Sequence, residues 1–135
     1  MNKSIKNLNA LFESLESPNE IAPGDYKVRM IWGFPPNFSW LGHKKVISVV
    51  GSETVGHNKI LGFISFGFFR AEQWNRSKSS RSKFFLNYNG DRLLGNVRDE
   101  LRILEPEQSY LGCFNVTDSE NQLKPLGYFT LTRIN

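Results

Sequence analysis

The chain has 135 residues, the usual size of one domain, and its single cysteine, Cys113, excludes a framework of intramolecular disulfides. A formal net charge of +4 suits weak attraction to nucleic acid or anionic lipid without pointing to either. The N-terminus lacks the apolar core of a signal peptide, and no apolar run reaches the roughly 18 residues that span a bilayer. We therefore expect one cytoplasmic domain over residues 1–135, a monomer or homodimer with no membrane span.

The first segment has the periodicity of an amphipathic helix. Its apolar stripe consists of Ile5, Leu8, Leu11, Phe12 and Leu15. Pro18 follows closely, and the residue before a proline is biased out of the α conformation. The pattern predicts a helix within residues 1–17. This helix would either plug one end of a barrel or cover a cavity as a lid.

From residue 24 the hydrophobic period changes to two, which is typical of strands. Strands are predicted at 26–32, 46–50, 59–69, 84–88, 92–104, 110–116 and 127–134, with a turn at 51–58. Two glycines in the apolar run, Gly62 and Gly67, would permit sharp coiling or a bulge. About seven short strands joined by hairpins favour an antiparallel up-and-down β-barrel over residues 24–134, because a closed barrel leaves no exposed edge.

Aromatic side chains dominate the predicted strand faces and are interpreted first as core. They are Trp32, Phe63, Phe66, Phe68, Phe85, Tyr88, Phe114 and Phe129. A barrel of eight strands is just wide enough to be filled by side chains or to hold one small ligand. Small residues in the same rows, such as Ser65 and Gly112, would leave room for a guest. The pattern does not distinguish a filled interior from a hollow one.

One predicted strand contains a conflict between pattern and chemistry. Arg98, Glu100 and Arg102 share one face and would form a solvated charge ladder, whereas Asp99 falls in the apolar row with Leu101. An ionised carboxylate in that row is costly unless it is paired or hydrogen-bonded. Three interpretations follow: a group that anchors a ligand or transfers protons, a structural group paired with backbone amides or an arginine, or a register shift that moves Asp99 to the surface.

Motifs for metal, cofactor or nucleophilic chemistry are absent from the sequence. His43 and His57 have no acidic or cysteine companions at ligand spacing, so we expect no metal and no cofactor. His43 lies close to Trp40 and would line a pocket mouth or the surface. Cys113 is expected to be a small core residue.

A basic stretch over residues 70–83 carries five cations and one acid. The cations are Arg70, Arg76, Lys78, Arg81 and Lys83. With Trp74 beside them, they would grip single-stranded nucleic acid, where bases stack on aromatic rings. A serine-interrupted basic stretch is more often a solvated loop, so the pattern disfavours nucleic acid as the partner.

Short elements of the chain resemble a known group. The run Trp40-Leu41-Gly42-His43-Lys44 is similar to the W-x-G-K element of lipocalin-like (calycin-type) β-barrel proteins, and further similar runs are Asn87-Tyr88, 96–100 and 127–131. Phe38 stands where the fuller pattern has glycine, and His43 separates Gly42 from Lys44. The resemblance implies an antiparallel barrel with an apolar cavity. It also implies that Trp40 packs beneath Arg133 and closes the barrel base through a cation–π contact.

Three functional hypotheses follow. The first is a binding protein for a small, largely apolar or amphipathic molecule held in the barrel. Its site residues would be Trp32, His43, Phe66, Tyr88, Arg98, Asp99 and Phe114. The second is an isomerase, cyclase or lyase using Asp99 as an acid/base group with Tyr88 or His43. The third is a nucleic-acid or protein interaction module working through the basic stretch.

Overall fold

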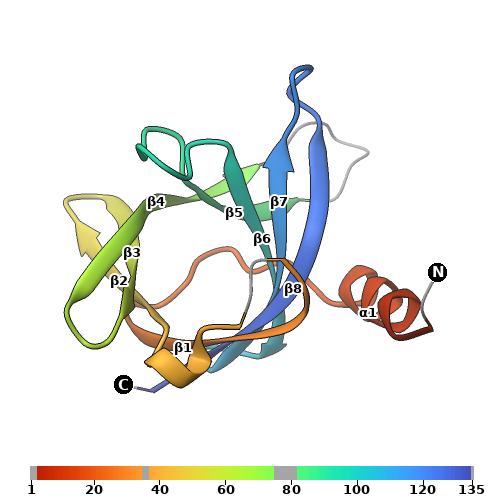
Figure 1. The fold of residues 1–135 in the computed structure, drawn as a ribbon, viewed down its shortest axis with the longest axis horizontal. Coiled ribbons are helices and arrows are strands. Elements are labelled where there is room, and N and C mark those ends of the chain that lie inside the picture. The colour runs from red at the N-terminus through yellow and green to blue at the C-terminus, as the bar shows by residue number, and fades with distance from the viewer. Residues whose placement is uncertain (1–2, 35–36, 75–81, 135) are drawn as a thin grey trace.

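The computed structural model describes residues 3–34, 37–74 and 82–134, and these form a closed antiparallel barrel of eight strands. The barrel has up-and-down order, so each strand pairs with its neighbours in sequence and β1 pairs with β8 (Figure 1). This confirms the predicted fold class. The elements are α1 (Lys3–Ser14), β1 (Gly24–Gly33), the short 3-10 helix η1 (Ser39–Leu41), β2 (Lys44–Val50), β3 (Glu53–Ile60), β4 (Ile64–Trp74), β5 (Lys83–Asn87), β6 (Val97–Glu105), β7 (Ser109–Thr117) and β8 (Leu123–Arg133).

The strand that the sequence pattern missed is β3, which lies where we predicted a turn. Only residues 51 and 52 separate β2 from β3, and Val50 pairs directly with Glu53 across this turn. The inward-facing residues of β3 include Gly56 and Asn58, which have low strand propensity. Both have tertiary reasons to be there. A Cβ at Gly56 would lie 2.5 Å from the Phe69 ring, and Asn58 is buried in a polar cluster inside the barrel.

The predicted strand at 59–69 is two strands separated by a tight turn. Leu61 and Gly62 both have positive φ, at 56° and 77°, which is the backbone of a hairpin turn. Further along β4, the pairing with β3 shifts register around Gly67, whose φ is 61°. The expectation of a bulge is therefore confirmed at Gly67. The bulge turns Phe68 outward, to 56% exposed, and so corrects its predicted place in the core.

Replacing Gly67 by alanine should destabilise the fold more than the same change at Gly62. Both glycines have left-handed backbone, so each substitution carries a conformational cost of about 1 kcal/mol. At Gly67 the new Cβ would also lie 2.8 Å from Asn58 and from Leu94, whereas at Gly62 it meets open space. We expect a loss of about 2–3 kcal/mol for Gly67→Ala in urea unfolding. Equal losses for the two variants would contradict this account.

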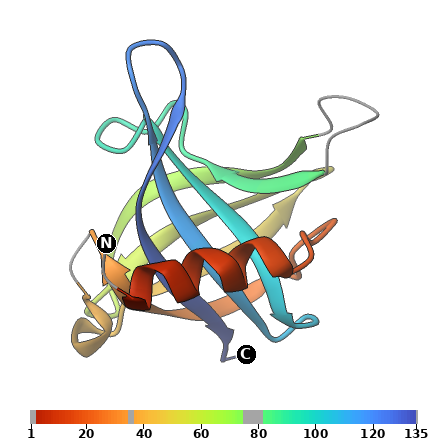
Figure 2. The same ribbon diagram turned by 90° about the vertical axis from the view of Figure 1, so that its right-hand side faces the viewer.

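Helix α1 lies against the outer wall of the barrel, not across its end. Figure 2 shows α1 crossing the outer side of β7 and β8. There Phe12 packs with Leu111 and Cys113 of β7 and with Tyr128 of β8. The predictions of a plug and of a lid are therefore both wrong. Cys113 is buried as expected, but in this second cluster; burial raises the pKa of its thiol to about 12.

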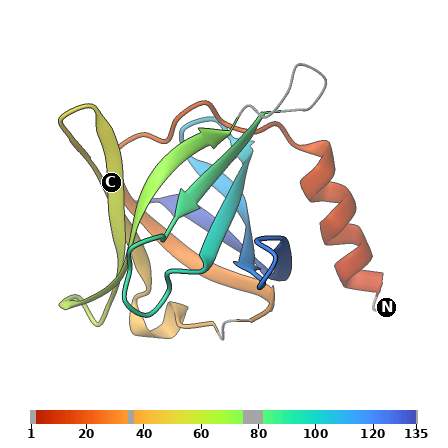
Figure 3. The same ribbon diagram turned by 90° about the horizontal axis from the view of Figure 1, so that it is seen from above.

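The segment between α1 and β1 closes one end of the barrel. Figures 1 and 3 show this segment passing from the helix across the strand ends. Ile21 is 3% exposed and belongs to the main core, and the Tyr26 hydroxyl donates to the carbonyl of Ala22 at 2.7 Å. Ile21 therefore takes the position that we had assigned to the helix.

The main core fills the barrel around this closed end. Its fully buried members include Tyr26, Leu86, Leu101 and Leu131, which point inward from four different strands.

Within the described residues, no helix is long and apolar enough to cross a membrane.

The remaining predictions about aromatic and basic residues need correction or lie outside the described residues. Trp40 is 77% exposed on η1, so it does not close the barrel base, and Phe63 is 77% exposed at the β3–β4 turn. The Arg133 guanidinium instead donates to the carbonyl of Pro23 at 3.0 Å. Of the basic stretch, Arg76, Lys78 and Arg81 lie outside the described residues; Arg70 and Trp74 belong to β4 and Lys83 to β5.

Candidate functional site

A buried ion pair lies inside the barrel near the end opposite Ile21. Lys45 on β2 and Asp99 on β6 are 4% and 1% exposed, and the Lys45 Nζ lies 3.3 Å from the Asp99 Oδ2. Tyr88, directly after β5, donates its hydroxyl proton to the same carboxylate oxygen at 2.8 Å. The inward direction of Asp99 confirms the predicted alternation of this strand and removes the register-shift interpretation.

The surroundings of this pair suit an ammonium group and a carboxylate. The Lys45 Nζ has three acceptors: the Tyr88 hydroxyl at 2.5 Å, the Asn58 Oδ1 at 2.8 Å and the Asp99 carboxylate. Three acceptors match the three N–H bonds of an ammonium group. Burial lowers the pKa of Lys45 and raises that of Asp99, and the opposite charge of each partner counteracts the shift of the other. We therefore treat the pair as ammonium and carboxylate.

Asn58 joins this pair to His43. The Asn58 Nδ2 donates to the carbonyl of Gly67 at 3.1 Å, which orients the amide so that its Oδ1 accepts. His43 Nε2 lies 3.0 Å from that Oδ1 and must therefore carry the ring proton. Burial, followed by the nearby charge of Lys45, lowers the pKa of His43 to about 4. At neutral pH the ring is thus neutral, with Nδ1 as an acceptor.

Apolar side chains surround the polar cluster and leave a cavity of about 50 Å³. Counted as the space open to the centre of a water molecule, roughly 10–15 Å³ is enough for one water. The cavity therefore has room for a few heavy atoms. Deeply buried residues form its floor, and partly exposed ones line its open end. The lining residues are Val28, Met30, His43, Lys45, Asn58, Phe66, Tyr88, Leu94, Asp99, Phe114 and Phe129.

The open end of the cavity is surrounded by exposed apolar loops. Successive strands run in opposite directions, so the β1–β2, β3–β4 and β5–β6 connections all lie at this end. Each connection carries exposed apolar side chains, among them Phe34, Phe63 and Leu93. Phe34 also contacts Phe114, with ring centroids 6.2 Å apart. An apolar molecule approaching the cavity therefore meets apolar surface first.

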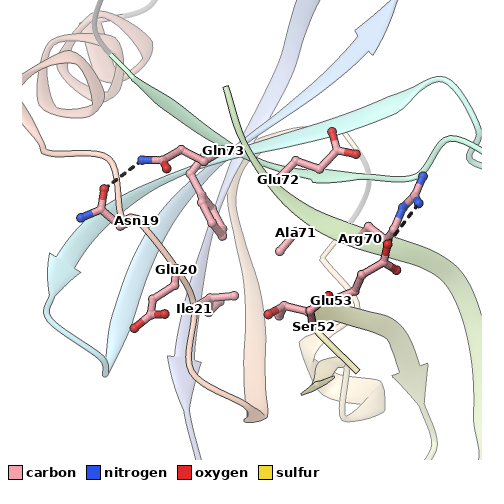
Figure 4. A pocket seen from close by; sticks show the side chains of 11 residues that line it. Asn19, Glu20, Ile21, Ser52, Glu53, Arg70, Ala71, Glu72 and Gln73 are labelled. Atoms are coloured by element: carbon pink, nitrogen blue, oxygen red, sulfur yellow. Dashed lines mark hydrogen bonds and ion pairs between the residues drawn. The ribbon is translucent and has the colours of Figure 1, made fainter. Parts of the chain in front are cut away.

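The closed end of the barrel carries a different hollow, which is polar. Its volume is about 300 Å³, and Figure 4 shows side chains from the α1–β1 segment and from β4 around it. An exposed ion pair joins Arg70 to Glu53 at 3.8 Å, and Gln73 donates to Asn19 at 2.9 Å. These groups are already partnered and largely exposed, so this hollow offers weaker fixed contacts than the cavity.

Five of the seven predicted site residues line the cavity, and two do not. His43, Phe66, Tyr88, Asp99 and Phe114 lie together there. The remaining two predictions, Arg98 and Trp32, are wrong. Arg98 faces outward on β6, where its guanidinium donates to the carbonyls of Gly95 and Val97. Trp32 is 38% exposed and lies with Ile31 and Leu11 in a shallow surface hollow near the helix.

Lys45 and Asn58 are the main site residues that sequence reasoning missed. A signal for Lys45 was present, because it shares the inward row of β2 with Ile47. A lysine in one inward row is a natural counter-charge for a carboxylate in another inward row. Asn58 gave no such signal, since it lay in a segment predicted to turn. Among the described residues, no group of three or more histidine, cysteine or carboxylate side chains is placed to hold a metal ion.

The low pKa of His43 should make stability depend on pH. In the unfolded chain this imidazole takes up a proton near pH 6.5, whereas in the folded protein it does so only near pH 4. The unfolded state therefore binds more protons between these values. The contribution of neutral His43 to the free energy of unfolding is complete above pH 6.5 and is lost as the pH falls to 4. The total loss is about 3 kcal/mol.

Urea unfolding at pH 7 and pH 4.5 would measure this effect, with His43→Phe compared against His57→Phe. His57 is only partly buried, and burial lowers its pKa as well. We expect most of the pH dependence of the protein between these values to survive in His57→Phe and to shrink in His43→Phe. An unchanged dependence in His43→Phe would refute the assignment.

Comparison with known proteins yields no relative. No family model matches the chain, and no curated protein or solved structure matches it significantly.

Proposed function

We propose that this barrel binds a small, largely apolar molecule in the cavity next to Lys45 and Asp99. The observation that supports it best is the composition of the cavity. Its walls are apolar, one end is open, and a few buried polar side chains lie at the other end. Ligand sites in proteins have this composition, with apolar walls and a small number of polar groups that orient the guest. The exposed apolar loops at the open end support the same proposal.

Binding is favoured over catalysis by the state of the charged groups. Lys45 donates hydrogen bonds to Asn58 and Tyr88 and forms an ion pair with Asp99, whose Oδ2 also accepts the hydrogen bond of the Tyr88 hydroxyl. Acid/base catalysis also needs a group that can give a proton to the substrate, and the donors of this site are already engaged with protein acceptors. The relation to lipocalin-like barrels and a cytoplasmic location remain proposals.

Methyl NMR titration would test the proposal. The protein would be titrated in turn with pentan-1-ol, its isomer butyl methyl ether, and pentanoate. We expect at least one compound to produce saturable shifts in the methyl signals of Met30, Leu94 and Val28, which line the cavity. If no compound shifts these signals, the proposal is wrong.

Two neighbouring variants supply a matched comparison. Met30→Trp places a larger side chain at the open end of the cavity and should weaken binding at least about tenfold. Ile31→Trp makes the same change on the next residue, which is 47% exposed and does not line the cavity. Binding by Ile31→Trp should equal that of the unmodified protein. Equal weakening in both variants would place the bound molecule elsewhere.

A further inference from the structure

The hydrogen-bond donors of the cavity are all in use. Lys45 donates to Asn58 and Tyr88 and forms an ion pair with Asp99, and the Tyr88 hydroxyl donates to Asp99. The amide of Asn58 donates to the carbonyl of Gly67 and to the Tyr88 oxygen, and His43 donates through Nε2. The other lining residues are apolar side chains without donors.

The acceptors of the same cavity are not all in use. Asp99 Oδ1 and His43 Nδ1 are buried and have no hydrogen-bond partner among the described residues. Both side chains are more than nine-tenths buried and both line the cavity. Buried acceptors of this kind are nearly always satisfied in native proteins, by protein groups, water or a ligand, so two in one cavity mark a place where a bound molecule donates hydrogen bonds.

We infer that the cavity selects a neutral molecule that donates hydrogen bonds, in the simplest case a small alcohol, and rejects carboxylates. This inference rests on the proposed function and adds the chemical class of the ligand to it. The hydroxyl would donate to Asp99 Oδ1 or to His43 Nδ1, and its hydrocarbon part would extend between Met30, Leu94 and Phe114 toward the open end.

The charge balance of the site explains the rejection of carboxylates. Lys45 looks like an anchor for an anionic head group, but its positive charge is already neutralised by Asp99. A ligand carboxylate would lie beside the carboxylate of Asp99 and would find no free N–H bond. Burying a second negative charge without a partner is strongly unfavourable. An ether of the same size would avoid the charge but would leave both acceptors unsatisfied.

The three NMR probes separate these cases. Pentan-1-ol and butyl methyl ether have the same formula, so their hydrophobic contribution is closely matched, and pentanoate adds the negative charge. We expect the alcohol to bind about 5–10 times more tightly than the ether, with no cavity binding by pentanoate. If the ether or pentanoate binds as tightly as the alcohol, the inference is overturned while the proposed function stands. If none of the three binds, the proposed function itself fails.

Replacing the acceptor at Asp99 Oδ1 by a hydrogen-bond donor gives a second test. In Asp99→Asn the amide oxygen can keep the contacts to Lys45 and Tyr88, so that an NH2 group replaces Oδ1. The preference should then shift toward the ether by at least about fivefold relative to the alcohol. Asp118→Asn, a change at a partly exposed residue of the β7–β8 turn that does not line the cavity, should leave the original preference unchanged. A preference for alcohol that survives Asp99→Asn would overturn the assignment to Oδ1; should that variant not fold, the three-probe comparison on the unmodified protein decides alone.

Discussion

Lys45→Met should destabilise the protein by about 3–5 kcal/mol, the largest effect that we expect from a single substitution. The side chain is 4% exposed, and its removal leaves the carboxylate of Asp99 buried without its counter-charge. Asn58 and Tyr88 lose a donor in the same step. Chemical unfolding at pH 7, followed by tryptophan fluorescence, would measure the loss.

Lys44→Met is the matched control, because Lys44 is the preceding residue on the same strand. It forms an ion pair with Asp25 at 2.9 Å in a partly exposed position, where such pairs contribute about 0–1 kcal/mol. The double substitution of Lys45→Met with Asp99→Leu should recover most of the stability, since no charge is then left unpaired. A small loss for Lys45→Met alone, similar to that for Lys44→Met, would show that the interior tolerates the free carboxylate.

Arg102→Met should loosen the N-terminal helix and cost about 2–4 kcal/mol. Arg102 is 2% exposed on the outer face of β6, where it pairs with Glu100 at 3.0 Å and stacks 4.4 Å from the ring centre of Phe12. Its guanidinium also donates to the carbonyls of Phe12 and Leu15 near the end of α1. Without it, a buried carboxylate and two carbonyls lose their donor.

Arg98→Met provides the control, because Arg98 lies on the same face of β6. Its guanidinium donates to the carbonyls of Gly95 and Val97, which are close to it in sequence. Removing the Arg98 side chain should therefore cost no more than about 1 kcal/mol. Amide hydrogen exchange would localise the effect: we expect protection of α1 to fall sharply in Arg102→Met and to persist in Arg98→Met. Equal protection of the helix in both variants would mean that Arg102 does not hold it.

The barrel could be predicted from sequence because alternation and turn residues are local signals. Tyr26, Val28 and Met30 alternate with charged residues, and this row does face the interior. β3 could not be predicted, because its inward positions hold Gly56 and Asn58, which suit their contacts with Phe69 and Gly67 on the neighbouring strand β4 and not the usual strand pattern. The place of α1 could not be predicted either. The charged row of β6 was expected to be solvated, yet Glu100 and Arg102 are buried and Arg102 binds the helix.

The candidate site was half predicted for a similar reason. Asp99 stood out because a carboxylate interrupts an apolar row, which is visible in one strand. Its partner, Lys45, comes from a strand 54 positions earlier, and only the closure of the barrel brings the two together. Arg98 was chosen as a ligand anchor by its charge, but strand alternation places it on the opposite face from Asp99.

The central claim, a cavity that holds a small hydroxyl compound, would be tested most directly by a crystal soaked with 3-bromopropan-1-ol. The bromine marks the molecule by its anomalous scattering. We predict a bromine peak between Met30, Leu94 and Phe114, with the hydroxyl oxygen within hydrogen-bond distance of Asp99 Oδ1 or His43 Nδ1. A well-diffracting crystal with no bromine in the cavity, or with bromine only on the outer surface, would contradict the claim.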